Sequence, residues 1–341
     1  MPDGSAKLLP GFILYVISSL SIMLLFTDHE LENLLSPLQL VNAVEAAMIS
    51  DEAHENFVPQ RMHIPHAGNT YLLMPAYGKE SFGTKLVSVV PENTKTGIPV
   101  INGMYSLNDA KTGIALALMN ASKLTALRTG AIAAVAIRSL TKPDVDAIGI
   151  IGPGVQAVWT AVCTAAVRPV KKIFVLGRSQ RSLENFIGQM KDRLPEVEIL
   201  PVANQEEILR KTSVIITAST SDVPVLPDDE QLLREKTFVA MGSYRKDMRE
   251  LPDAVFKLSN RIIIDAPGTR HEVGDVLHPV QKGYVREENV ITLGSILTGK
   301  NQINSGTTVF KSAGYALFDL FVAQKLYREA RSNGRGITFN F

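Results

Sequence analysis

The length of the chain suggests about two domains, and its composition is that of an ordinary globular protein. It has 341 residues, of which 45% are hydrophobic and 20% are charged, and a domain usually takes about 100–200 residues. The 35 basic residues almost balance the 34 acidic ones, which leaves a net charge of +1. Because the basic residues are also dispersed along the chain, we expect no nucleic-acid partner.

The cysteine and histidine content argues against a cysteine nucleophile, a disulfide framework and a metal site. The single cysteine, Cys163, lies in an apolar helical run and is expected to be a small core residue rather than a nucleophile. No disulfide can form within the chain, which fits a reducing compartment, and we predict a cytoplasmic protein. The six histidines show no metal-ligand spacing, so we expect no metal site.

The N-terminal region contains an apolar stretch, residues 8–26, that is long enough to span a membrane or to serve as a signal peptide. Pro10 and Gly11 interrupt it, and serines dilute it. Residues 23–27 are more typical of the first strand of a globular domain. We therefore predict that residues 1–22 are an extension and that no membrane is involved, with a membrane anchor as the alternative.

The first third of the chain predicts an α+β domain. Thr27 or Asp28 is expected to cap a helix that begins near Glu30, and Ser36-Pro37 opens a second helix. Short apolar runs then alternate with turn signals, which is typical of an antiparallel sheet. The runs lie at residues 70–74, 83–90, 102–107 and 114–119, with a hairpin turn at 108–113 and a helix at 122–140.

The segment 147–177 predicts a dinucleotide-binding unit. An apolar run, residues 147–151, leads directly into a Gly-x-Gly-x-x-Ala turn at 152–157, and a helical stretch and a second apolar run at 172–177 follow. In such a unit the first glycine allows a tight turn, the second lets the backbone approach a pyrophosphate, and the small third residue lets helix and strand pack closely. The motif alone is weak, but here both flanks fit it.

The end of the second strand indicates which nicotinamide cofactor is bound. NAD-preferring sites usually carry Asp or Glu there, about 20 residues past the glycines, to bind the ribose 2′-hydroxyl. This chain has Gly177, Arg178 and Ser179, with Arg181 close behind. A guanidinium suits a 2′-phosphate, so we predict NADPH as the preferred cofactor. A solvated basic turn is the alternative.

The remaining runs complete the predicted fold. Residues 199–202, 214–217, 238–242 and 261–265 are further strand candidates, and a last long helix is expected at 310–331. Alternating strands and helices favour a Rossmann-type, doubly wound parallel sheet. We predict an α/β protein with this Rossmann domain at 123–310. An α+β substrate-binding and dimerisation domain is expected at 23–122 together with 311–341.

Four motifs in this order resemble the ornithine cyclodeaminase/mu-crystallin family. They are residues 83–85, 127–131, 152–157 and 242–251, and the resemblance extends from about residue 23 to 331. The family includes ornithine and lysine cyclodeaminases, alanine dehydrogenases, opine-type synthases and ketimine reductases. Mu-crystallin, a ketimine reductase, also binds thyroid hormone. The resemblance alone implies a homodimer.

The resemblance also assigns roles to individual residues. Lys85 matches the catalytic lysine beside the reacting carbon, Arg128 the arginine that holds the substrate carboxylate, and Arg61 a second substrate-facing arginine. Without the family, each could be a surface charge, although Lys85 lies inside an apolar strand run. The expected cofactor contacts are Thr129, Gly152, Pro153, Gly154, Val155, Gln156, Arg178, Ser179, Arg181, Thr217, Ser219, Met241 and Gly242.

Two departures from the cyclodeaminase pattern decide between the family's reactions. Cyclodeaminases carry an aspartate where this chain has Tyr244, and a glutamate in the strand where this chain has Leu72 and Leu73. Without these carboxylates the site lacks a base and a grip on a distal ammonium. We therefore predict NADPH-dependent reduction of cyclic α-imino acids, Δ1-pyrroline-2-carboxylate and Δ1-piperideine-2-carboxylate, to L-proline and L-pipecolate.

Three alternatives remain open on the sequence. One is a dehydrogenase of an open-chain amino acid such as alanine, and another is ornithine cyclodeamination itself. The third is a non-catalytic carrier that holds NADPH and a small hormone-like ligand. The presence of both Lys85 and Arg128 counts against the carrier.

Overall fold

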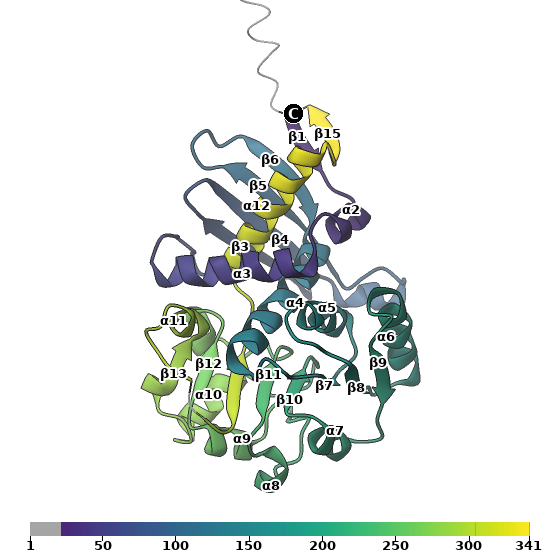
Figure 1. Cartoon of the computed structure of the whole chain (residues 1–341). Coiled ribbons are helices and arrows are strands. Elements are labelled where there is room, and N and C mark those ends of the chain that lie inside the picture. Colours follow the sequence, from purple (N-terminus) through teal and green to yellow (C-terminus); the bar gives the residue numbers. More distant parts are fainter. Residues whose placement is uncertain (1–21, 304, 341) are drawn as a thin grey trace, which may run out of the picture.

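The computed structural model describes residues 22–303 and 305–340 and contains two β-sheets, one above the other (Figure 1). The predicted N-terminal extension lies, apart from Ile22, outside the described residues. Within the described ranges, no helix is both long and apolar enough to cross a membrane. Cys163 is fully buried, as predicted.

The upper sheet is the predicted α+β part of the molecule. Its seven strands lie in the order β15-β1-β6-β5-β4-β3-β2, and all neighbours are antiparallel except the parallel pair β1 and β6. The hairpin between β5 and β6 confirms the predicted turn. The strands are β1 (Ile22–Leu25), β2 (Met62–His66), β3 (Asn69–Tyr77), β4 (Ser81–Val89), β5 (Ile101–Asp109), β6 (Ala115–Asn120) and β15 (Ile337–Asn340).

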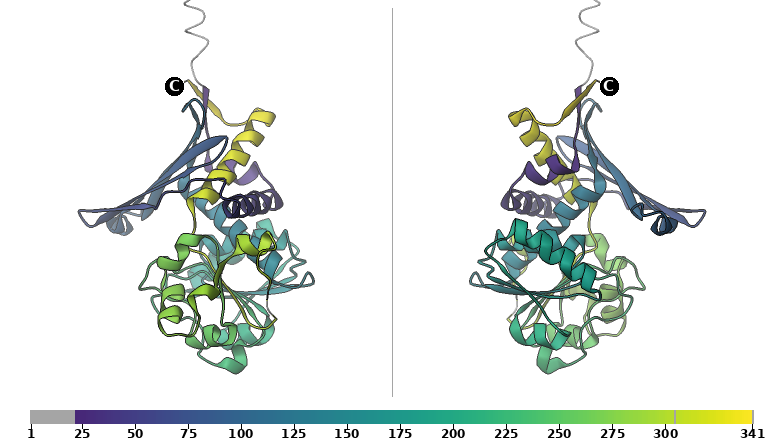
Figure 2. Two further views of the ribbon diagram at one scale, coloured as in Figure 1. Left: turned by 90° about the vertical axis from the view of Figure 1, so that its left-hand side faces the viewer. Right: turned by 90° about the vertical axis from the view of Figure 1, so that its right-hand side faces the viewer.

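Helices α3 and α12 cover one face of this sheet, and the opposite face is open in both views of Figure 2. The predicted helix starts are confirmed, because Thr27 and Ser36 each form a capping box with the residue three positions later. The helices of this part are α2 (Asp28–Asn33), α3 (Pro37–Glu52), α4 (Ala121–Leu140) and α12 (Ala316–Asn333), with a 3₁₀ turn η1 (Pro91–Lys95).

The lower sheet is the predicted doubly wound parallel sheet. Its strands lie in the order β13-β12-β14-β11-β10-β7-β8-β9, and every neighbouring pair is parallel. The strands are β7 (Ala147–Ile151), β8 (Lys172–Leu176), β9 (Glu198–Pro201), β10 (Val214–Thr217), β11 (Thr237–Ala240), β12 (Ile262–Ile264), β13 (Val290–Thr292) and β14 (Thr308–Lys311).

From β7, strands β8 and β9 follow towards one edge of the sheet, whereas β10 and the later strands lie on the other side of β7. In such folds, ligands bind outside the carboxyl ends of the strands at this switch point between β7 and β10. Helices on both faces bury the sheet. They are α5 (Val155–Ala165), α6 (Gln180–Arg193), α7 (Gln205–Lys211), α8 (Glu230–Leu233), α9 (Asp253–Ser259), α10 (Gly274–Gln281) and α11 (Leu293–Leu297), with 3₁₀ turns η2 (Pro267–His271) and η3 (Glu287–Asn289).

The prediction of one helix over residues 310–331 was wrong at its start. Phe310 and Lys311 belong to β14, which lies between β11 and β12 near the centre of the sheet, and α12 begins only at Ala316. A short apolar strand that is buried on both faces has no alternation, so hydrophobic periodicity does not separate it from a buried helix. The correction matters because it places a turn, residues 312–315, between the two elements.

Helix α4 joins the two halves of the molecule. Most of its side chains are buried, and it packs against α3 on one side and α5 on the other. The main apolar core is therefore continuous from beneath the upper sheet to one face of the parallel sheet, and a second core covers the other face of the parallel sheet. Since α4 carries the motif at 127–131, this packing also sets the position of Arg128.

Candidate active site

Lys85 is buried inside the upper sheet rather than solvated. It lies on β4 opposite Tyr105 of β5, and its side chain is 3% exposed. The ammonium group donates hydrogen bonds to Asp319 Oδ2 at 2.8 Å and to Thr125 Oγ1 at 3.2 Å. A buried charge persists only when it is paired and hydrogen-bonded in this way.

Asp319 is a residue of this candidate site that the sequence analysis missed. It lies on α12, is fully buried, and also accepts a hydrogen bond from Arg128 Nε at 3.2 Å. One carboxylate therefore joins two of the predicted site residues, which come from different elements. The available signal was a single acidic residue in the apolar helical run 316–323, since buried carboxylates are rare unless paired.

Burial brings the pKa of the Lys85 ammonium down towards neutral pH. Burial lowers the pKa of Lys85, the nearby Arg128 and Arg61 lower it further, and Asp319 opposes them, with a resulting pKa of about 8. Burial opposes ionisation of Asp319, but Lys85 and Arg128 outweigh it and lower the pKa of that carboxyl. Asp319 thus stays an anion while Lys85 can release a proton near neutral pH.

Arg61 lies just before β2 and faces the same region. Its Nη2 atom donates to Glu272 Oε2 at 2.9 Å and to the carbonyl oxygen of Gly314 at 2.7 Å. Burial raises the pKa of Glu272, although Arg61 opposes this shift. The side chain of Arg61 is 20% exposed, so a solute can still reach its guanidinium.

A cleft of about 760 Å³ lies beside these residues. Arg61 lines it directly, whereas Lys85 and Arg128 lie next to its lining residues, because Lys85 pairs with Met74 and Arg128 contacts Gly314. Tyr244 lies at the edge of the cleft, 56% exposed, with the Arg245 guanidinium 5.6 Å from the centre of its ring. Positively charged side chains from both halves of the molecule, Arg61 and Arg245, therefore line the cleft.

The glycine turn after β7 fits the pyrophosphate of a dinucleotide. Gly152 has a φ of +94°, which favours glycine, and a Cβ atom there would lie 2.6 Å from the oxygen of Ala218. Gly154 begins α5 without a side-chain cap, so no side chain occupies the first N–H groups of the helix. Val155 and Gln156 form that first turn, and such helix starts bind phosphate.

The predicted 2′-phosphate contacts lie on the surface after β8. Arg178, Ser179 and Arg181 are all exposed, and Ser179 caps α6 by accepting the N–H of Ser182 at 3.3 Å. Neither arginine forms an ion pair within residues 22–303 and 305–340. Both guanidinium groups therefore remain available to an anion.

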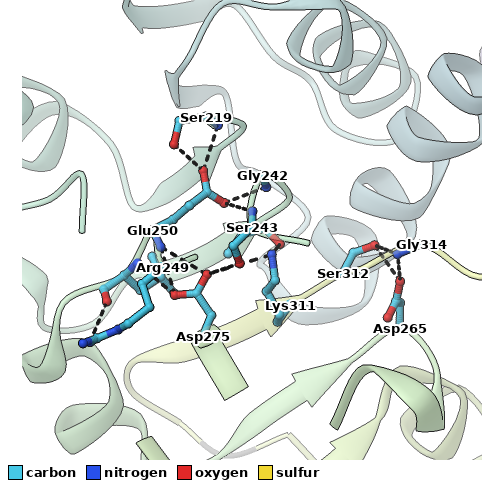
Figure 3. Close-up of polar contacts among 12 residues, drawn as sticks. Ser219, Gly242, Ser243, Arg249, Glu250, Asp265, Asp275, Lys311, Ser312 and Gly314 are labelled. Carbon is cyan, nitrogen blue, oxygen red and sulfur yellow. Dashed lines mark hydrogen bonds and ion pairs between the residues drawn. The ribbon is translucent and has the colours of Figure 1, made fainter. Parts of the chain in front are cut away.

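The remaining predicted cofactor residues gather at the carboxyl ends of β10 and β11, with Thr129 next to Arg128 on α4. Figure 3 shows that the buried Glu250 joins the two strand ends. Its Oε1 accepts the N–H and the hydroxyl of Ser219, both at 2.8 Å, and its Oε2 accepts the N–H of Gly242 at 2.6 Å. Thr217 ends β10, and Met241 precedes Gly242.

Comparison with known proteins places this geometry in a family. Residues 21–334 match the ornithine cyclodeaminase/mu-crystallin family. A Δ1-pyrroline-2-carboxylate reductase of Bacillus cereus is 32% identical over 328 residues, which cover 94% of this chain and 100% of that protein.

Two solved structures are similar over nearly their whole length. The Thermococcus litoralis Δ1-pyrroline-2-carboxylate reductase in complex with NADH and L-proline has a TM-score of 0.85 at 32% identity, covering 92% of this chain and 99% of that one. An archaeal alanine dehydrogenase dimer with bound NAD also has a TM-score of 0.85, at 26% identity, covering 94% and 100%. The chain therefore belongs to the ornithine cyclodeaminase/mu-crystallin family.

Proposed function

We propose that this protein uses NADPH to reduce cyclic α-imino acids, Δ1-pyrroline-2-carboxylate and Δ1-piperideine-2-carboxylate, to L-proline and L-pipecolate. The chain is an NAD(P)-dependent oxidoreductase that acts on imines, as its family and its reductase relatives indicate. The choice of substrate rests on the buried group of Lys85, Arg128 and Asp319, which lies next to the cleft that Arg61 lines.

This group suits a substrate with a carboxylate beside a C=N bond. In our proposal Arg61 and Arg128 hold the carboxylate, because a planar guanidinium binds it in a fixed orientation. The bound cofactor supplies the hydride, which the imine carbon accepts. Lys85 supplies the proton that the nitrogen takes up as the C=N bond becomes a C–N bond. Asp319 keeps Lys85 charged until then.

The lining of the cleft argues against ornithine cyclodeamination. Tyr244 and the neutral strand around Leu72 offer no carboxylate for a distal ammonium. Among the described residues that line the cleft, Glu272 is the one acid, and it already forms an ion pair with Arg61. A substrate without a charged tail fits this lining better than ornithine does.

An open-chain amino acid dehydrogenase is the second candidate, because the alanine dehydrogenase structure has the same TM-score as the pyrroline-2-carboxylate reductase. The two are separated by measuring NADPH oxidation with Δ1-pyrroline-2-carboxylate and, in parallel, with pyruvate plus ammonia. Faster oxidation with the cyclic imine supports our proposal. Turnover that requires pyruvate and ammonia would show that the protein is an open-chain amino acid dehydrogenase instead.

The role of Lys85 has its own test. A Lys85→Met variant keeps a similar volume but has no proton to give, and general acid catalysis typically contributes about 10²–10⁴-fold. We expect kcat for the imine to fall by about that factor while NADPH still binds, as measured by fluorescence titration. Full turnover by this variant would show that Lys85 is not the proton donor.

The preference for NADPH is also a proposal. Its support is the pair of exposed, unengaged guanidinium groups of Arg178 and Arg181 beside Ser179 and the absence of an acidic residue at the end of β8. The two similar structures hold NADH and NAD, so the proposed preference for NADPH rests on these residues of this chain alone. Comparing KM for NADPH and NADH tests it.

We further propose a homodimer formed through the open face of the upper sheet. Leu86 and Met104 are cross-strand partners on that face and are 39% and 47% exposed. Met62 and Ile64 of β2 are exposed on the same face, where Met62 pairs with Leu73 beside Leu86, and exposed apolar patches of this kind mark interaction surfaces. The similar alanine dehydrogenase is a dimer.

A further inference from the structure

The turn between β14 and α12 contacts both arginines of the site. The carbonyl oxygen of Gly314 accepts the hydrogen bond from Arg61. A Cβ atom at Gly314 would lie 2.7 Å from Arg128 Nη1 and 3.0 Å from Nη2, and its φ of +78° favours glycine. The carbonyl group of this residue therefore orients the Arg61 guanidinium, and the absence of a side chain leaves the space that the Arg128 guanidinium occupies.

A buried carboxylate from another strand holds this turn. Asp265 follows β12 and is 4% exposed. Its Oδ2 accepts the hydroxyl of Ser312 at 2.6 Å and the N–H of Gly314 at 2.9 Å, while Oδ1 accepts the hydroxyl of Thr269 at 2.6 Å (Figure 3 shows the contacts to Ser312 and Gly314). Such a fully hydrogen-bonded buried network rigidifies the backbone around it.

We propose that Asp265 and Gly314 form a positioning unit that sets Arg61 and Arg128 for a single substrate carboxylate, an inference that rests on the proposed function. Asp265 makes no hydrogen bond or ion pair with either arginine in the described part of the chain, so it acts through the turn. Arg61 comes from the upper sheet and Arg128 from α4, whereas Asp265 belongs to the parallel sheet. The unit therefore fixes the position of the substrate-carboxylate site relative to the nucleotide-binding half of the molecule.

Loss of this positioning is expected to weaken the binding of the substrate. A displacement of about 1 Å in a positioning group can cost about 10²-fold in rate, because a bidentate carboxylate contact tolerates little change in geometry. The glycine turn at 152–154 is distant in sequence and shares no hydrogen bond with Asp265. A loosened turn at Gly314 should therefore weaken binding of the imino acid and leave binding of NADPH largely unchanged.

The test compares two variants with a matched control. Gly314→Ala places a methyl group against Arg128, and Asp265→Asn keeps the shape of the side chain but removes its charge. We expect each to raise KM for Δ1-pyrroline-2-carboxylate about tenfold or more, with KM for NADPH unchanged. The control is Thr212→Val, which removes a buried hydroxyl just before β10, at the other end of the parallel strands, that donates to the carbonyl oxygens of Ile208 and Val214. It should lower thermal stability without raising KM for the imine.

A double-mutant cycle distinguishes positioning from general loosening of the core. If Asp265 acts through the arginines, its effect on KM for the imine is smaller in an Arg128→Ala background than in the wild type, and Arg61 accounts for the part that remains. Additive effects, or an equal rise of this KM in Thr212→Val, would overturn the proposal. Should Asp265→Asn fail to fold, Ser312→Ala removes one of the two bonds that hold the turn and replaces it in the cycle.

A crystal structure of Gly314→Ala gives an answer that does not depend on the substrate. We expect displaced guanidinium groups at Arg61 and Arg128, and unchanged positions would contradict the positioning unit. If instead the wild-type enzyme reduces no cyclic imine, the proposed function is wrong. The crystal structure of Gly314→Ala still shows whether the turn positions Arg61 and Arg128. A wild-type enzyme that reduces the imine, with unchanged KM in both variants, would overturn the inference alone.

Discussion

Asp319 makes Lys85 usable as an acid, and this relation gives a testable pH dependence. Lys85 must be an ammonium to protonate the imine, so activity should be present below its pKa of about 8 and fall as the pH rises through that value. Asp319 is the group that raises this pKa, whereas Arg128 and Arg61 lower it. In Asp319→Asn the alkaline limb of kcat/KM should therefore move to lower pH. A limb that stays in place, or moves upward, would show that another group titrates.

Arg178 provides the second prediction for a single residue. A guanidinium that binds the 2′-phosphate contributes about 1.5–3 kcal/mol as a charged hydrogen bond, so Arg178→Ala should raise KM for NADPH about tenfold or more. KM for NADH should change little because NADH has no such phosphate. Steady-state kinetics with both cofactors measure this, and Lys142→Ala, at the opposite ends of the parallel strands, is a suitable surface control. Equal changes for NADPH and NADH would leave Arg178 as a solvated charge.

At the scale of elements, the carboxyl ends of β10 and β11 are held together by Glu250. Its two oxygens accept the N–H groups of Ser219, Gly242 and Ser243. Glu250→Gln offers only one acceptor oxygen, and a buried N–H left unpaired costs about 1–3 kcal/mol. We expect weaker NADPH binding by fluorescence titration and a lower Tm. A lower Tm with unchanged NADPH affinity would make Glu250 a purely structural residue.

The elements also show why sequence analysis reached the fold but not the whole site. Lys85, Arg128 and the glycine turn are each marked by a local motif, and the structure brings the first two together. The pairing of Asp319 with them was not visible, because residues more than 190 positions apart in sequence meet only through the packing of α12 against the upper sheet. The misplaced start of α12 hid the Gly314 turn for the related reason that a doubly buried strand has no distinctive period. Strand β15 was missed because its residues are exposed and β1 alone pairs with it.

At the scale of the whole molecule, the open face of the upper sheet predicts the oligomeric state. Leu86→Lys combined with Met104→Lys would place two like charges, which cannot pair with each other, in the proposed interface, where unpaired buried charge is strongly unfavourable. We expect the wild-type chain to have the mass of a dimer by light scattering and the double variant that of a monomer. A matched substitution on the other side of the molecule, Lys257→Glu, should leave the mass unchanged. A wild-type monomer would contradict the proposed interface.

If the protein reduces cyclic α-imino acids, hydride reaches the carbon between the carboxylate and the nitrogen of the cyclic imine. The most direct measurement is to incubate the enzyme with Δ1-pyrroline-2-carboxylate and NADPH deuterated at the transferable position of C4, and to analyse the product by mass spectrometry and NMR. We expect L-proline with a single deuterium at Cα and consumption of one NADPH for each proline formed. Proline without deuterium at Cα, or no proline while ornithine is converted with the cofactor regenerated, would contradict the proposed function.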